Sequence, residues 1–263
     1  MKLGCLPYLN VKPLVYPFEH GNLPQNWELI YEPPSTLARL LAKHKIAAAP
    51  VPSFATFLNP DLCTVPGICI ASHGAVNTVL MVSKVEISEV KSVALDTSSL
   101  SGAAMLKILL AELYKLRPDY VRAVPHPAEM LKVADAAMVI GNPAMLMSKE
   151  DLHVLDLGTA WMELTGLPAV FAVWAGPREA LTSKLIQELE RAKEIGIGKI
   201  EEISREESAK LGVPYEICYD YLANVMKYDL GRDEIQSLEI FAQKAHEHKL
   251  LEVEPEVKVV GRG

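Results

Sequence analysis

Short apolar runs alternate with helical segments through the opening of this chain. The order is strand 2–6, helix 10–19, strand 27–31, helix 35–44 and strand 46–51. Ser35 is the expected N-cap of the second of these helices. Strands that alternate with helices are typical of a parallel sheet covered by its crossover helices. We therefore predict an α/β fold for the start of the chain.

A second unit of the same kind lies in the middle of the chain, over residues 91–168. Pro143 fits the first turn of a short helix, where a missing N–H costs nothing, and Gly166 with Pro168 ends the last helix. The expected strands are 92–95, 120–124, 136–140 and 153–157, and the expected helices are 100–116, 128–133 and 159–165. After residue 177 the chain becomes charged and helical, over 178–195, 199–211, 215–227 and 233–248.

Two apolar segments of strand length, 79–82 and 169–174, lie on either side of the middle unit. We expect the chain to cross between two α/β lobes through these two hinge strands. Residues 1–84 and 174–263 would form the first lobe, and residues 85–173 the second. This layout is that of the type II periplasmic-binding-protein fold. Small anions bind between the lobes of such folds, at loops and helix N-termini, and the lobes close around them.

The composition of the chain limits the classes of molecule that are expected to bind it. There are 33 acidic and 26 basic side chains, which give a net charge of −7. Without a basic patch, nucleic acid and an anionic membrane are not expected partners. The most apolar run, 46–58, contains two prolines and is shorter than the roughly 20 residues that a membrane-spanning helix needs. No signal-peptide pattern is present, so we expect a cytoplasmic protein with four buried free cysteines.

Two polar loops follow strands where ligands bind in such folds. Asn10 follows the first strand, where it could bind a ligand or cap the next helix. The segment 96–102 places four hydroxyls and a glycine before a long helix. Free N–H groups and hydroxyls at a helix start suit a carboxylate or phosphate, although an ordinary capping loop is the alternative. Segments 74–78 and 139–144 would present further polar groups to the cleft.

Other features carry no predicted chemistry. The sequence contains no phosphate-binding glycine loop, zinc-protease helix or nucleophile-elbow motif. His246 and His248 lie two residues apart on a charged helix, hence on different faces, and no metal site is predicted there. Trp27, Trp161 and Trp174 are expected in the core.

From residue 3 to about residue 176, the chain resembles the chorismate dehydratase family of the futalosine route to menaquinone. The resemblance rests on motifs that occur in the family's order. They are Tyr8-Leu9-Asn10 with Pro13-Leu14, Val51-Pro52-Ser53, Gly74-Ala75-Val76-Asn77-Thr78, the 95–101 loop, the 135–144 element, Asp156-Leu157-Gly158, Trp161 and the segment 165–174. The last three are the most specific.

The resemblance implies dehydration of chorismate to 3-[(1-carboxyvinyl)oxy]benzoate, a lyase reaction that removes the C3 proton and the C4 hydroxyl. It implies a small carboxylate as substrate and no metal or organic cofactor. Because the matched segments contain no obvious general base, we hypothesise that a carboxylate of the substrate takes the proton. The expected catalytic residues are Asn10 and Thr78, and the expected substrate-binding residues are Tyr8, Ser53, Asn77, Ser98, Ser99, Ser101, Gly102 and Asn142.

The sequence departs from the family pattern in three places. Asn142, followed by Pro143, stands where the family has Asp, Ser101-Gly102 replaces Thr-Ser, and the stretch 45–48 lacks an expected acidic residue. Two alternatives therefore stay open. One is a non-catalytic binding protein for a small carboxylate, and the other is a divergent menaquinone-pathway enzyme acting on a related ligand.

Overall fold

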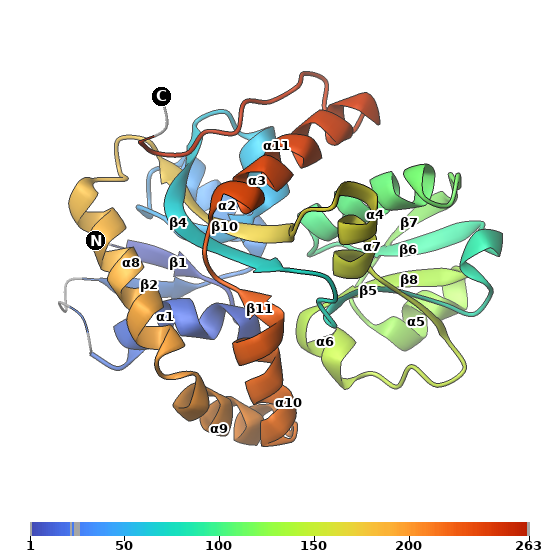
Figure 1. The fold of residues 1–263 in the computed structure, drawn as a ribbon, viewed down its shortest axis with the longest axis horizontal. Helices are drawn as coiled ribbons and strands as arrows, with labels where there is room; N and C mark the ends of the chain where they lie inside the picture. The colour runs from blue at the N-terminus through green and yellow to red at the C-terminus, as the bar shows by residue number, and fades with distance from the viewer. Residues whose placement is uncertain (1, 22, 24–26, 262–263) are drawn as a thin grey trace.

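The computed structural model describes residues 2–21, 23 and 27–261. Two α/β lobes lie side by side (Figure 1). Both ends of the chain build the first lobe, and the middle of the chain, green to yellow in the figure, builds the second. Within the described part of the chain, no helix is long and apolar enough to cross a membrane.

The first lobe opens with the predicted parallel β-α-β-α-β arrangement. Strand β1 (Lys2–Cys5) pairs in parallel with β2 (Glu28–Tyr31), and Leu3 forms a parallel bridge with Ala48, next to β3. Helices α1 (Lys12–Glu19) and α2 (Pro34–Ala42) connect the strands. The predicted N-cap at Ser35 is wrong because α2 already begins at Pro34, whose fixed φ suits the first helical position.

Two long antiparallel strands form the centre of the first lobe. Strand β4 (Leu62–Ser72) pairs with β10 (Ala169–Pro177), which also pairs with β3 (Ala49–Pro52). The sequence analysis did not predict β4. Pro66 and Gly67 interrupt this strand, and the register shifts there: Val173 lies opposite Cys69, but Ala175 lies opposite Thr64. Such a bulge accommodates a proline inside a strand.

The second lobe matches the predicted strands closely. Its five-stranded sheet has the order β7-β6-β8-β5-β9, with β5 antiparallel to both of its neighbours. The strands are β5 (Val79–Ser83), β6 (Ser92–Asp96), β7 (Asp119–Ala123), β8 (Ala136–Ile140) and β9 (His153–Asp156). The helices are α4 (Leu100–Glu112), α5 (Pro127–Val133), α6 (Gly141–Leu146), which contains Pro143 in its first turn, and α7 (Leu157–Thr165), which ends at Gly166.

The remaining helices belong to the first lobe. The predicted helix 215–227 is instead α10 (Tyr215–Asp220), a π-helical turn (Tyr221–Val225) and the short strand β11 (Met226–Lys227). The helix stops there because β11 pairs with the end of β4. The others are α3 (Ser53–Leu58), α8 (Ser183–Ile197), α9 (Ile200–Leu211) and α11 (Arg232–Glu247).

The sheets divide the chain at other points than the predicted boundaries at 84/85 and 173/174. Strand β5 lies in the five-stranded sheet of the second lobe, and β10 joins the four-stranded sheet of the first lobe from Ala169 onward, opposite Ser72. We therefore propose that the lobes meet at the connections 73–78 and 166–168, with β4 and β10 as the strands that lead into the hinge. An apolar run of strand length does not reveal which sheet it joins, because both sheets bury such strands equally well.

Asp156 fastens the first connection to the second lobe. Its carboxylate accepts hydrogen bonds from Val76 N (3.0 Å) and Asn77 N (2.7 Å). The same carboxylate caps α7 by accepting from Gly158 N (2.9 Å) and Thr159 N (3.0 Å). One side chain therefore holds both the crossover loop and the start of the neighbouring helix.

The lobes also share an aromatic cluster. Phe54 and Phe57 of α3, Phe241 of α11 and Trp161 of α7 have ring centroids 5.4–5.9 Å apart. Trp161 and Trp174 are buried as predicted, whereas Trp27 is half-buried. All four cysteines are buried free thiols, as predicted.

Candidate functional site

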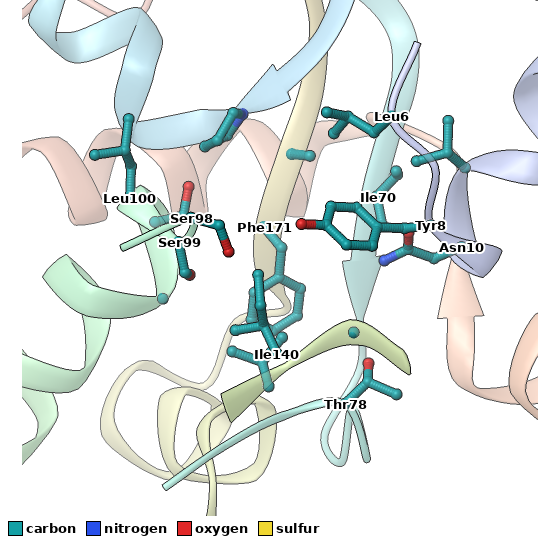
Figure 2. Close-up of a pocket in the computed structure, with 17 residues that line it drawn as sticks. Leu6, Tyr8, Asn10, Ile70, Thr78, Ser98, Ser99, Leu100, Ile140 and Phe171 are labelled. Carbon is teal, nitrogen blue, oxygen red and sulfur yellow. The ribbon is translucent and has the colours of Figure 1, made fainter. Parts of the chain in front are cut away.

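A pocket of about 610 Å³, counted out to its open mouth, lies where the lobes face each other (Figure 2). The first lobe contributes Leu6, Tyr8, Asn10, Val11, Pro52, Ile70, Phe171 and Ala172, and the second lobe contributes Thr78, Val79, Ser98, Ser99, Leu100, Ser101, Gly102, Ile140 and Gly141. Seven of the ten predicted site residues are in this lining.

The loop after β1 places Asn10 at the pocket. Helix α1 has Val11 at its N-cap position and no side-chain cap bond, so the capping interpretation of Asn10 is wrong. The Oδ1 atom of Asn10 is buried and has no hydrogen-bond partner among the described residues. A buried, unpaired acceptor costs free energy unless a ligand satisfies it. Asn10 is therefore a candidate ligand-binding residue.

Thr78, directly before β5, joins Asn10 through a residue that was not predicted from the sequence. Thr78 Oγ1 lies 2.7 Å from the Tyr221 hydroxyl, and Asn10 hydrogen-bonds the same hydroxyl. Tyr221 is fully buried, and this burial raises the pKa of its hydroxyl to about 12. No local signal in the sequence connects Tyr221 to two residues so far away along the chain, and its segment was predicted as an ordinary helix.

Tyr8 reaches across the pocket toward the second lobe. Figure 2 shows its hydroxyl pointing toward Ser98 and Ser99, and the hydroxyl hydrogen-bonds Ser98. Ser98 in turn donates to Asp96 Oδ1 over 2.5 Å, which holds the serine side chain in place. Burial raises the pKa of Tyr8 above its usual value; the Ser98 hydrogen bond opposes this rise and the Asp96 charge adds to it. Tyr8 therefore keeps its proton at neutral pH.

The Tyr8 ring lies against Gly141. A Cβ at Gly141 would lie 3.2 Å from Tyr8 Cδ1, and the φ of +63° also favours glycine. The strand-to-helix turn at 139–144 thus contributes Ile140 and Gly141 to the lining, whereas the predicted Asn142 is not part of it. Asn142 lies one residue further along α6, and the turn of the helix takes it away from the lining.

The hydroxyl-rich loop forms the start of α4. Ser99 occupies the N-cap position, but its side chain makes no cap bond, which argues against the ordinary capping alternative. The first four N–H groups of a helix have no partners within it, and the helix dipole favours an anion there. Because Ser99, Ser101 and Gly102 all line the pocket, the start of α4 faces the ligand space. The anion-binding interpretation is therefore favoured.

Ser101 and Ser53 join the lobes. Ser101 Oγ accepts from Phe54 N (3.2 Å) and lies 3.1 Å from Ser53 Oγ. Ser53 is fully buried and donates to Val170 O (2.8 Å). Ser53 is not in the pocket lining, so the prediction that it binds substrate gives way to a supporting contact behind Ser101. Gly102 has no room for a side chain, since a Cβ would lie 2.6 Å from Ser99 Oγ.

Asn77 is the third predicted site residue outside the lining. Its side chain is exposed, its φ is +63°, and its backbone N–H donates to Asp156. Asparagine tolerates this left-handed conformation well, which explains its place in the crossover loop. The turn directs Asn77 outward and Thr78 inward.

The lining carries no charge. Among the described residues around the pocket there is no Lys, Arg, His, Asp or Glu, and Tyr8 is the one titratable group. An anionic ligand here would be held by hydroxyls, an amide and a helix start rather than by cations. In the described ranges, no three His, Cys, Asp or Glu side chains gather so that they could hold a metal ion.

The fold resembles those of two solved proteins. A protein from Archaeoglobus fulgidus has a TM-score of 0.78 at 18% identity and matches 95% of this chain and 98% of its own. The periplasmic aliphatic sulphonate binding protein of Escherichia coli has a TM-score of 0.67 at 15% identity, with 100% and 94% covered. These likenesses confirm the periplasmic-binding-protein-like fold.

Sequence comparison narrows the family. The model for menaquinone biosynthesis proteins matches residues 1–247, a range that includes both polar loops and the segment around Tyr221. Chorismate dehydratase of Thermus thermophilus is 31% identical over 260 residues, which cover 92% of this chain and 93% of that protein. This chain therefore belongs to the menaquinone biosynthesis family.

Proposed function

We propose that this protein is a chorismate dehydratase, a hydro-lyase that converts chorismate to 3-[(1-carboxyvinyl)oxy]benzoate and water. The relative from Thermus thermophilus supports the choice of substrate. The observation that carries the proposal is the pocket itself. It offers a helix start, several hydroxyls and an unpaired Asn10 acceptor, with no charged side chain among the described lining residues.

The first part of the proposal concerns binding. Chorismate carries two carboxylates, and the start of α4 is a suitable place for the one on the ring, because N–H groups and the helix dipole stabilise an anion without a cation. Ser99 and the Tyr8 hydroxyl lie beside this helix start. The apolar side chains of Ile70, Ile140 and Phe171 would cover the ring.

The second part concerns proton transfer. The C3–H bond breaks, its electron pair forms the C3–C4 double bond, and the C4–O bond breaks, which makes the ring aromatic. A general base must lie within hydrogen-bond reach of the proton it removes. The described lining has no carboxylate, imidazole or amine, and Tyr8 stays protonated. We therefore assign the base to the enolpyruvyl carboxylate of the substrate. The proton taken from C3 then leaves with the C4 hydroxyl as water.

Asn10 and Thr78 have orienting roles in this proposal. Their polar groups come from the first lobe and from the end of the connection 73–78, and they share one hydrogen-bond partner, so they converge on one side of the pocket. From there they would hold the substrate and the leaving hydroxyl in a reactive geometry, which can supply a large part of a rate enhancement.

Incubation with chorismate tests the proposal directly. Chromatography and mass spectrometry should detect an aromatic enol ether that has lost one water, and omission of protein is the control. Chorismate that binds in calorimetry but is never converted would instead identify a small-carboxylate binding protein. If chorismate is neither bound nor converted, the result would favour a family member that acts on a related ligand.

A further inference from the structure

The hydroxyl of Tyr221 lies at the meeting point of the two residues predicted to be catalytic. It is 2.7 Å from Thr78 Oγ1, and it also hydrogen-bonds the Asn10 side chain. Tyr221 is 4% exposed, and it does not line the pocket. It therefore acts from behind the two side chains rather than by touching a ligand.

An unusual backbone conformation places Tyr221 there. It is the first residue of the π-helical turn Tyr221–Val225, which follows α10 and leads directly into β11. Strand β11 is tied to β4 by the pairing of Met226 with Ser72. Single π-helical turns are rare and occur frequently at functional sites. The position of the tyrosine ring is thus determined by a specialised turn between two fixed elements.

The available partners constrain the direction of the hydrogen bonds around Tyr221. Asn10 Oδ1 has no partner among the described residues, so Asn10 contacts the tyrosine through its Nδ2 group, which donates. The Tyr221 oxygen is then an acceptor toward Asn10. Either oxygen of the Thr78–Tyr221 contact can donate, and the arrangement in which Tyr221 donates leaves the Thr78 proton free. The Thr78 proton is left with Val76 O, a distant acceptor at 3.4 Å, or with a ligand in the pocket.

We propose that Tyr221 is a positioning residue for the dehydration. By donating to Thr78 and accepting from Asn10, it presents the Thr78 proton to the leaving C4 hydroxyl and the Asn10 Oδ1 acceptor to the substrate. The assignment to chorismate rests on the proposed function. The contacts of Tyr221 with Thr78 and Asn10 do not depend on that assignment.

The same contact joins the first lobe to the connection between the lobes. Asn10 and Tyr221 belong to the first lobe, whereas Thr78 is the last residue of the connection 73–78, directly before β5. The 2.7 Å contact therefore holds the end of this connection against the first lobe, where Thr78 reaches the pocket.

Tyr221→Phe removes the hydroxyl and keeps the ring, and Tyr228→Phe is its matched control. Tyr228 is also buried, and its hydroxyl has no partner within the described structure. We expect Y221F to lower kcat by about 10- to 100-fold with KM changed less than about threefold, because small losses of alignment reduce turnover strongly. Y228F should leave both constants unchanged.

A double-mutant cycle with Thr78→Val separates positioning from a merely structural role. If Tyr221 acts through Thr78, Y221F should reduce kcat little further in the T78V background. The inference would be overturned if the two substitutions lowered kcat by independent factors that multiply in the double variant. It would also be overturned if Y221F kept the kcat of the wild type. If the wild-type protein does not convert chorismate, the proposed function fails instead. A crystal structure of Y221F then decides the inference, which is refuted if Asn10 and Thr78 keep their side-chain orientations and is supported if either one turns.

Discussion

Gly158 lies where the crossover loop presses against the start of α7. A Cβ at this position would lie 2.3 Å from Gly74 O and 2.5 Å from Ser72 Oγ. Both distances are far below normal contact, and the nearer atom is backbone that cannot turn away. Gly158→Ala must therefore shift the loop, and overpacking of this kind costs about 1–3 kcal/mol of unfolding free energy. For a chain of this size, about 2–4 °C of Tm is lost per kcal/mol.

Differential scanning calorimetry and chorismate turnover together test this prediction. We expect the Tm of G158A to fall by about 2–12 °C. Its kcat should fall as well, because the loop that must move carries Thr78 to the pocket. Gly198→Ala is the control, since Gly198 has an ordinary helical φ of −64° and a Cβ there meets nothing closer than 3.4 Å. A G158A protein with the Tm and kcat of the wild type would refute the argument.

Three further predictions follow from the site and its surroundings. Asn10→Ala should reduce chorismate turnover by about 100-fold or more with an unchanged circular-dichroism spectrum; normal turnover would remove Asn10 from the mechanism. Because burial raises the pKa of Tyr8, and raises that of Tyr221 to about 12, kcat measured across neutral to mildly alkaline pH should be flat. A change of kcat near neutral pH would instead indicate a general base that belongs to the protein. Hydrogen bonds from Lys91 N and Ser92 lower the pKa of Asp135 below its usual 3.8. The Asp135 carboxylate therefore stabilises the fold above pH 3.8, and this stabilisation is lost as the pH falls through the lowered pKa. The Tm values of the wild type and Asp135→Asn should thus become equal in acid.

Much of the second lobe could be predicted because its signals are local. Strands 92–95 and 136–140 are compact apolar runs, helix α5 begins at Pro127, and helix α7 ends at Gly166. Strand β4 escaped prediction because Pro66 and Gly67 break its pattern, and only pairing with β10 makes the bulge tolerable. The helix predicted over 215–227 ends early because β11 is captured by the edge of β4, a contact between distant parts of the chain.

The candidate site likewise has features that could be predicted from the sequence and features that could not. The order of residues alone predicts that polar loops follow the strands at residues 2–6 and 92–95, because side chains such as Asn10 and Ser99 stand at recognisable strand ends. Because those loops contain no basic residues, the sequence also predicts that they would bind an anion without them. Predictions of this kind rest on chain neighbours, which a strand-to-helix turn brings together in any α/β fold.

Packing between distant elements selects which of these side chains face the pocket. Asn77 and Thr78 are adjacent, yet one points to solvent and the other to the pocket, because Asp156 holds the loop in a left-handed turn. Tyr221 joined the site through a π-helical turn far along the chain. The orientation of a side chain and its hydrogen-bond partners depend on packing between elements that are distant in sequence, and no local sequence pattern encodes them.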